Sequence, residues 1–138
     1  TLPDDIAALL RDWEQALHEK DLDALARCYD PDVRLYDLNT QLDGYPAYRA
    51  LWEQCLPHFP NPITCERKDL VAVVGPEVAT LTFLSRMSGM ETEHPAVKAW
   101  YRSTMVLRRI DGSWKIVHEH NSMPCDFEAE KPVYLMDE

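Results

Sequence analysis

The 138-residue sequence has little positive charge, no long apolar run and no paired-cysteine motif. It contains 14 Lys and Arg residues against 24 Asp and Glu residues, so its formal net charge is −10. No basic stretch is long enough to offset this charge, which argues against nucleic acid or an anionic membrane surface as a partner. No apolar segment approaches the ~20 residues of a membrane span, so we expect no membrane insertion.

Cysteines are few, and their spacing fits neither a disulfide scaffold nor a zinc motif. Cys28, Cys55, Cys65 and Cys125 contain no CxxC pair, so we expect reduced thiols in a cytoplasmic protein. The N-terminal segment lacks the charged-then-apolar pattern of a signal peptide, although Thr1 is compatible with removal of an initiator Met or a leader. The length predicts one domain over residues 1–138.

Apolar residues at helical spacing predict three helices in the first half of the chain. The first is expected within residues 2–20, and a shorter one at 21–29 with Asp21 as its cap. A third is expected at 45–56, because the prolines that follow it prevent continuation.

The second half of the chain is rich in β-forming residues. After a short strand at 33–38, we expect long strands at 63–75, 77–89, 98–110 and 113–122. The Asp111-Gly112 pair between the last two predicts a hairpin, and the tail from 124 to 138 shows no clear period. Helices followed by antiparallel strands indicate an α+β fold with the helices on one face of the sheet.

The ending YRSTMVLRRIDGSWKIVHEHNSMPCDFE resembles the SnoaL-like families. Their last hairpin combines an Arg-x-Ser/Thr strand, a DG turn and the motif W-[KR]-I-V-H-E-H-x-S-x-P, matched here from Arg102 to Pro124. The element order is similar to that of nuclear transport factor 2 (NTF2) and its relatives, which include ketosteroid isomerases, polyketide cyclases and kinase association domains. The resemblance implies a cone-shaped, cystatin-like fold, in which a highly curved antiparallel sheet and three helices enclose a pocket. The uncovered sheet face leads us to expect a homodimer.

A second resemblance concerns chemistry. The segment CYDPDVRLYDL is similar to the ketosteroid-isomerase segment that delivers the catalytic Asp, and the match places that base at Asp37. The isomerase's oxyanion-binding Tyr falls on or near Trp13, and its second donor falls among Met105, Val106 and Leu107, none of which can donate. The resemblance therefore implies a retained base without the family's oxyanion hole.

Two histidines on the last predicted strand are further candidates. Strict alternation places His118 and His120 on the face of Trp114 and Ile116, with Glu119 on the opposite face. Imidazole changes charge near neutral pH, so we predict that one or both act as a catalytic acid or base; a structural role is the alternative. A metal bound by both, with Asp37 or Glu119 to complete the site, is a third interpretation; Glu119 points to the opposite face and no third His has an obvious route in, so we expect no metal.

The remaining candidates concern ligand binding. Asp37 continues the apolar face of its strand and should be partly desolvated, which strengthens it as a proton acceptor. Arg102 and Thr104 share one face of their strand, and the sequence leaves open which face lines the pocket. We predict ligand contacts from Trp13, Tyr48, Trp52, Arg102 and Thr104.

Two functions follow from these residues. One is a small-molecule-binding domain whose pocket suits an apolar, carbonyl or carboxylate ligand, or a module that only assembles subunits. The other is a cofactor-independent isomerase, cyclase or lyase that uses Asp37 and His120 for proton transfer. No phosphate loop, nucleotide fingerprint or nucleophile motif is present, so we expect no organic cofactor.

Overall fold

The helices of the first half of the chain form where apolar residues recur at helical spacing. The computed structural model describes residues 2–88 and 94–137, and places α1 at Asp4–His18, α2 at Leu22–Ala26 and α3 at Tyr45–Cys55. The buried residues of α1 are those of its apolar stripe: Ile6, Leu9, Leu10, Trp13, Ala16 and Leu17. This stripe packs towards the sheet, as an amphipathic helix requires.

Helix α2 is shorter than the predicted 21–29. Asp21 caps it as expected, because its Oδ1 accepts a hydrogen bond from the backbone N of Ala24 at 3.0 Å. The helix ends at Ala26, and strand β1 (Tyr29–Tyr36) begins four residues before the predicted start because Tyr29 is already aligned with Ile116 of another strand. A short β2 (Gln41–Asp43), which the sequence did not predict, pairs with β1.

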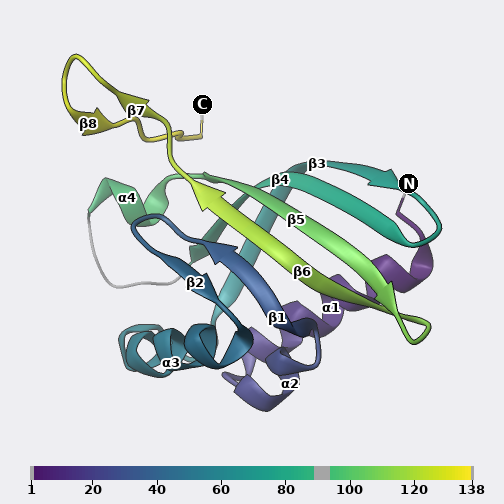
Figure 1. Ribbon diagram of the computed structural model, residues 1–138. Coiled ribbons are helices and arrows are strands. Elements are labelled where there is room, and N and C mark those ends of the chain that lie inside the picture. The colour runs from purple at the N-terminus through teal and green to yellow at the C-terminus, as the bar shows by residue number, and fades with distance from the viewer. Residues whose placement is uncertain (1, 89–93, 138) are drawn as a thin grey trace.

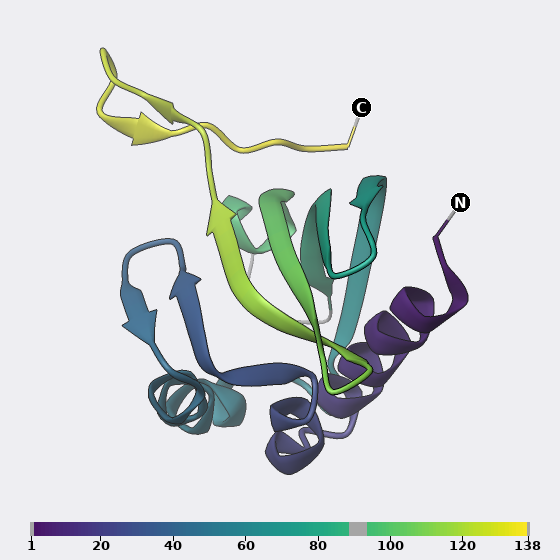
Figure 2. The ribbon, with the colours of Figure 1, turned by 45° about the vertical axis from the view of Figure 1, so that its right-hand side comes forward.

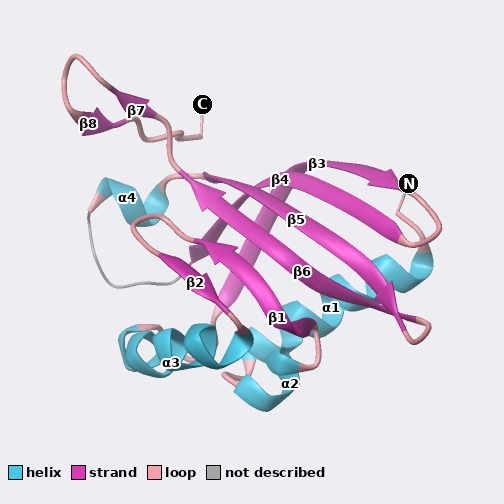
Figure 3. Cartoon of the chain, in the orientation of Figure 1, coloured by secondary structure: helices cyan, strands magenta, loops and turns pink. Residues whose placement is uncertain are grey.

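One six-stranded sheet contains the long strands. β3 (Thr64–Val74), β4 (Val78–Ser88), β5 (Tyr101–Ile110) and β6 (Ser113–Ser122) complete the order β2–β1–β6–β5–β4–β3. The last predicted residue of β4, Gly89, lies outside the described residues. The sheet curls around α1 and α3 (Figures 1 and 2), and the separation of helices from strands (Figure 3) confirms the α+β prediction.

Pairing is antiparallel throughout this sheet except between β1 and β6, which run parallel. A parallel pair needs a long connection, and most of the chain lies between these two strands. At the β5–β6 turn, Asp111 and Gly112 have φ values of 51° and 81°. Both lie in the left-handed region that a two-residue hairpin turn requires, so the predicted hairpin is confirmed.

The C-terminal tail forms a small hairpin of β7 (Cys125–Asp126) and β8 (Lys131–Pro132) that projects from the body (Figure 2). Beyond it the chain returns to Trp100, which follows the short α4 (Pro95–Lys98). The Trp100 backbone N donates to Leu135 O at 2.7 Å, and its Nε1 donates to Asp137 Oδ1 at 2.8 Å. No helix in the described part of the chain is long and apolar enough to cross a membrane.

Candidate ligand cavity and its acid–base groups

A bulge in β6 decides which of its side chains face the helices. Val106 of β5 is aligned with His118, whereas the next residue, Leu107, is aligned with Ile116. Val117 is therefore an extra residue on β6, and an extra residue shifts the alternation of every side chain beyond it.

Because of the bulge, the side chains in the second half of β6 point to the opposite face of the sheet from the one that strict alternation predicts. Glu119 is only 3% exposed and lines a cavity together with Asn121, while His118 and His120 lie on the outer face of the sheet. The prediction that both histidines continue the strand's apolar face is therefore wrong, because it assumed strict alternation through Val117.

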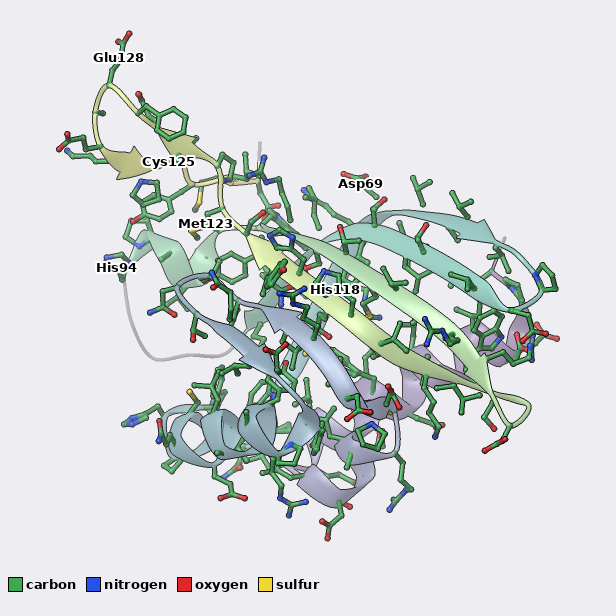
Figure 4. The ribbon with its side chains drawn as sticks, in the orientation of Figure 1. Asp69, His94, His118, Met123, Cys125 and Glu128 are labelled. Carbon is green, nitrogen blue, oxygen red and sulfur yellow. The ribbon has the colours of Figure 1, made fainter. Side chains whose placement is uncertain are left out.

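On the outer face the two histidines form a cluster with β1. The ring of Tyr36 lies 5.1 Å from that of His118 and 5.4 Å from that of His120, and Arg34 stacks over Tyr36. His118 Nδ1 lies 2.8 Å from the carbonyl oxygen of Arg34, and Figure 4 shows His118 beside β1. These contacts are those of residues that tie two strands together.

A cavity of about 360 Å³ lies between the inner face of the sheet and helices α1 and α3. Its size falls within the range of small-molecule pockets. Aromatic and other apolar side chains form much of its wall, namely Trp13, Tyr48, Trp52, Phe59, Phe83 and Met105. Such a wall favours a largely apolar ligand, because apolar surface leaves water on binding.

Glu119 is a buried carboxyl group in this wall. One of its oxygens accepts from the Tyr29 hydroxyl at 2.7 Å, and the other accepts from the Tyr48 hydroxyl and from Asn121 Nδ2, each at 3.3 Å. These donors are neutral, and burial raises the pKa of Glu119 above its usual value of 4.5, with the hydrogen bonds opposing the shift. Glu119 therefore retains its proton to a higher pH than an exposed glutamate.

The two tyrosines bound to Glu119 are neutral phenols. Burial, followed by the nearby Glu119 charge, raises the pKa values of both Tyr29 and Tyr48 well above 10. Trp13 Nε1 donates to the Tyr29 hydroxyl at 2.9 Å, which fixes that hydroxyl as a donor to Glu119. Tyr48, in contrast, lines the cavity.

A line of polar groups crosses the inner face of the sheet from Glu119. Ser103 Oγ on β5 donates to Asn121 Oδ1 at 2.7 Å, and Ser85 Oγ on β4 lies 2.7 Å from Ser103 Oγ. We call Ser85, Ser103, Asn121 and Glu119 the polar strip. It gives a ligand hydrogen-bonding groups along one side of an otherwise apolar cavity.

Asp37 lines the same cavity from the end of β1. Val33 and Leu35 are buried, so the expected alternation up to Asp37 is confirmed. Its backbone N donates to Thr40 O at 2.9 Å. The charge of Asp37 adds to the burial that raises the pKa values of Glu119 and Tyr48, which places the three groups in one electrostatic environment. Its role as a base stays a prediction.

The predicted ligand contacts divide into two groups. Trp13, Tyr48 and Trp52 line the cavity, and their contact with a ligand stays a prediction. Strand β5 instead presents Tyr101, Ser103 and Met105 to the cavity. Its alternate residues Arg102 and Thr104 therefore lie on the outer face, and the expectation that they line the pocket is wrong.

Sequence reasoning missed Glu119, Asn121 and Arg67 as cavity residues. Strict alternation assigned the first two to the wrong face, because no glycine marks the bulge in the sequence. Arg67 reaches the cavity only through the tertiary fold. Within the described residues, no three His, Cys, Asp or Glu side chains are grouped so that they could hold a metal ion.

Comparison with known proteins agrees with this architecture. Residues 6–126 match the sequence model of the SnoaL-like domain. An NTF2-like protein of unknown function from Pseudomonas putida KT2440 has 28% sequence identity and a TM-score of 0.83, over 96% of this chain and 94% of that chain. No curated protein matches the sequence.

Two more distant structures share the fold. A candidate ketosteroid isomerase from Shewanella frigidimarina NCIMB 400 is 19% identical with a TM-score of 0.71, over 86% of this chain and 95% of that chain. A candidate scytalone dehydratase from Novosphingobium aromaticivorans DSM 12444 is 17% identical with a TM-score of 0.67, over 85% of this chain and 80% of that chain.

Proposed function

The chain belongs to the SnoaL-like domain family, and within that family we propose that its cavity binds a small apolar carbonyl compound and moves a proton next to the carbonyl. The observation that carries this proposal is the buried Glu119 carboxyl, held by neutral donors in the wall of a cavity that Asp37 also lines. The carboxyl group of Asp37 and the buried carboxyl group of Glu119, whose pKa burial raises, then share a single apolar site.

In the proposed reaction Asp37 takes a proton from the carbon next to the carbonyl. The electron pair of the broken C–H bond moves to the carbonyl oxygen, which becomes an enolate. The hydroxyl of Tyr48 turns its single hydrogen from Glu119 to that oxygen, and Glu119 in its protonated form then donates its own hydrogen to the Tyr48 oxygen, so that the bond between the two residues is reversed and kept. Asp37 then returns the proton, to the same carbon or to a conjugated one. In this reaction Glu119, and not the predicted His120, is the second acid–base residue beside Asp37, because His120 lies outside the cavity.

Trp52 supports the placement of the ligand oxygen beside Tyr48. Its ring centroid lies 5.9 Å from that of Tyr48, and it is 7% exposed. Its Nε1 is buried close to the Tyr48 hydroxyl, whose pKa it lowers, but it makes no hydrogen bond of good geometry with any described residue. A buried donor without a well-formed hydrogen bond is costly, so a ligand oxygen beside Tyr48 would also improve the hydrogen bonding of Trp52.

Deuterium exchange tests this function without knowledge of the natural substrate. The protein is incubated with β-tetralone in deuterium oxide, and loss of the protons next to the carbonyl is followed by NMR. We expect faster exchange than in buffer, and a loss of about 10²-fold or more in Asp37→Asn, since a general base contributes 10²–10⁴-fold. The matched control is His120→Gln on the outer face, which should keep the wild-type rate. Equal exchange by wild type and Asp37→Asn would refute the proposal.

We also propose that the outer face of the sheet pairs with a second copy of the chain. Val71 and Val73 of β3 are 60% and 68% exposed. Their partners on β4 are Thr82 and Thr80, so a face of β-branched side chains without formal charge extends from β3 to β4. An uncovered apolar sheet face of this kind supports a homodimer.

A further inference from the structure

Arg67 extends the polar strip to the far side of the cavity. It lies on β3 directly opposite Ser85 in the β3–β4 register, and it lines the same cavity as Glu119. Its guanidinium carbon lies 5.1 Å from the ring centroid of Trp13 and 5.2 Å from that of Phe83. The positive charge thus lies within cation–π distance of two aromatic rings.

Only part of this guanidinium has a protein partner. Nη1 donates to Glu14 Oε1, whereas Nη2 is buried and has no partner among the described residues. The Arg67 side chain is 12% exposed. A buried charged donor that lacks an acceptor is expensive, because it has lost its water without replacement.

Arg86, the other arginine of the cavity wall, provides a contrast. Its Nε donates to Glu66 at 2.5 Å, and its Nη1 donates to Asp137 at 2.9 Å and to the carbonyl oxygen of Lys98 at 3.3 Å. Arg86 thus binds two carboxylates and a carbonyl oxygen, which hold the tail and the start of β3, and none of its nitrogen atoms is among the buried ones that lack a partner in the described residues. Arg67 retains a donor for a ligand.

The position of Arg67 gives the cavity two separate polar regions for a ligand. Asp37 directly follows β1 and Glu119 lies on β6, while Arg67 is on β3, an edge strand of the sheet. Strands β5 and β4 lie between them, so we place a carbonyl beside Tyr48 and a group beside Arg67 in different parts of one ligand.

We propose that the ligand of this cavity is a carboxylic acid, whose carboxylate binds Nη2 of Arg67 while its apolar body fills the aromatic part of the cavity. A planar guanidinium with a free N–H is the side chain best suited to a carboxylate, through a charge-assisted hydrogen bond. The carbonyl end of the ligand, and hence its description as a keto acid, rests on the proposed function. The carboxylate end does not.

Isothermal titration of the intact chain with phenylbutyrate and with the neutral phenylbutyramide tests the carboxylate end. We expect the acid to bind at least about tenfold more tightly than the amide, as one charge-assisted hydrogen bond implies. Arg67→Gln should remove this preference while the amide still binds. Glu14→Gln leaves Arg67 in place and removes its competing carboxylate, so the preference should increase.

The two variants keep the inference open to refutation even if one of them folds poorly. Equal affinity of wild type for acid and amide would overturn it, and so would an unchanged or smaller preference in Glu14→Gln. Loss of both probes in a folded Arg67→Gln protein would also overturn it, because Arg67 would then only support the cavity. A preference for the acid without β-tetralone exchange would refute the proposed function alone, and exchange without a preference would refute this inference alone.

Discussion

Replacement of Glu119 by Gln tests the buried carboxyl through the pH dependence of stability. Glutamine can still accept a hydrogen bond from Tyr29 and can donate to the hydroxyl of Tyr48, but it cannot ionise. The folded-state pKa of Glu119 lies above the usual 4.5 because the group is buried. The folded protein therefore binds a proton that the unfolded chain releases as the pH rises above 4.5.

The sign and the slope follow from this difference. The wild-type protein is stabilised by the Glu119 proton below about pH 4.5, and it loses that contribution as the pH rises towards the folded-state pKa. Between the two pKa values the loss approaches about 1.4 kcal/mol per pH unit. Tyr29 and Tyr48 do not add to it, because their pKa values are well above 10.

Urea unfolding followed by tryptophan fluorescence from pH 5 to pH 8 measures the effect. Near pH 5 the Gln variant should be less stable than wild type by about 1 kcal/mol, the net value of a typical hydrogen bond. This deficit should shrink or reverse as the pH rises. The control is Glu128→Gln, at the tip of the β7–β8 hairpin (Figure 4), whose difference from wild type should not change with pH. Parallel stability curves for wild type and Glu119→Gln would refute the reasoning.

Three further predictions concern thiols, histidine and assembly. Burial raises the pKa values of Cys28 and Cys65 to about 11, so at pH 8 a disulfide reagent should label exposed Cys125 much faster than either; equal rates would contradict this. Because His120 lies outside the cavity, His120→Ala should leave phenylbutyrate affinity within about twofold of wild type by titration calorimetry, and a tenfold loss would place it in the site. Val73→Asp should shift the chain from dimer to monomer in light scattering, whereas a monomeric wild type would exclude the proposed pairing.

The fold was readable from local patterns because each pattern has a single physical cause. Helical spacing of apolar residues placed α1 correctly, since those side chains must leave water together. The Asp111-Gly112 pair placed the last hairpin, since that turn needs left-handed backbone at both residues. The parallel pairing of β1 with β6 has no local signature and was not predicted.

The candidate site was only half predictable, for a reason that lies in one residue. Asp37 follows an uninterrupted alternation from Val33, and it reached the cavity as expected. Glu119 lies beyond the extra Val117, and sequence alternation therefore assigned it to the outer face. Arg67 is separated from its aromatic neighbour Trp13 by most of the first half of the chain, and no local pattern joins them.

The extra residue in β6 also bears on how annotations may pass between relatives. A homologue with the same motif letters that pairs this strand in a regular ladder, without a bulge at the position of Val117, would direct its HxH histidines inward and its intervening glutamate outward. Two chains could then share the string and have opposite chemistry in their cavities. Transfer of residue roles along this strand is valid only after the register of the strand against its hairpin partner has been compared in three dimensions.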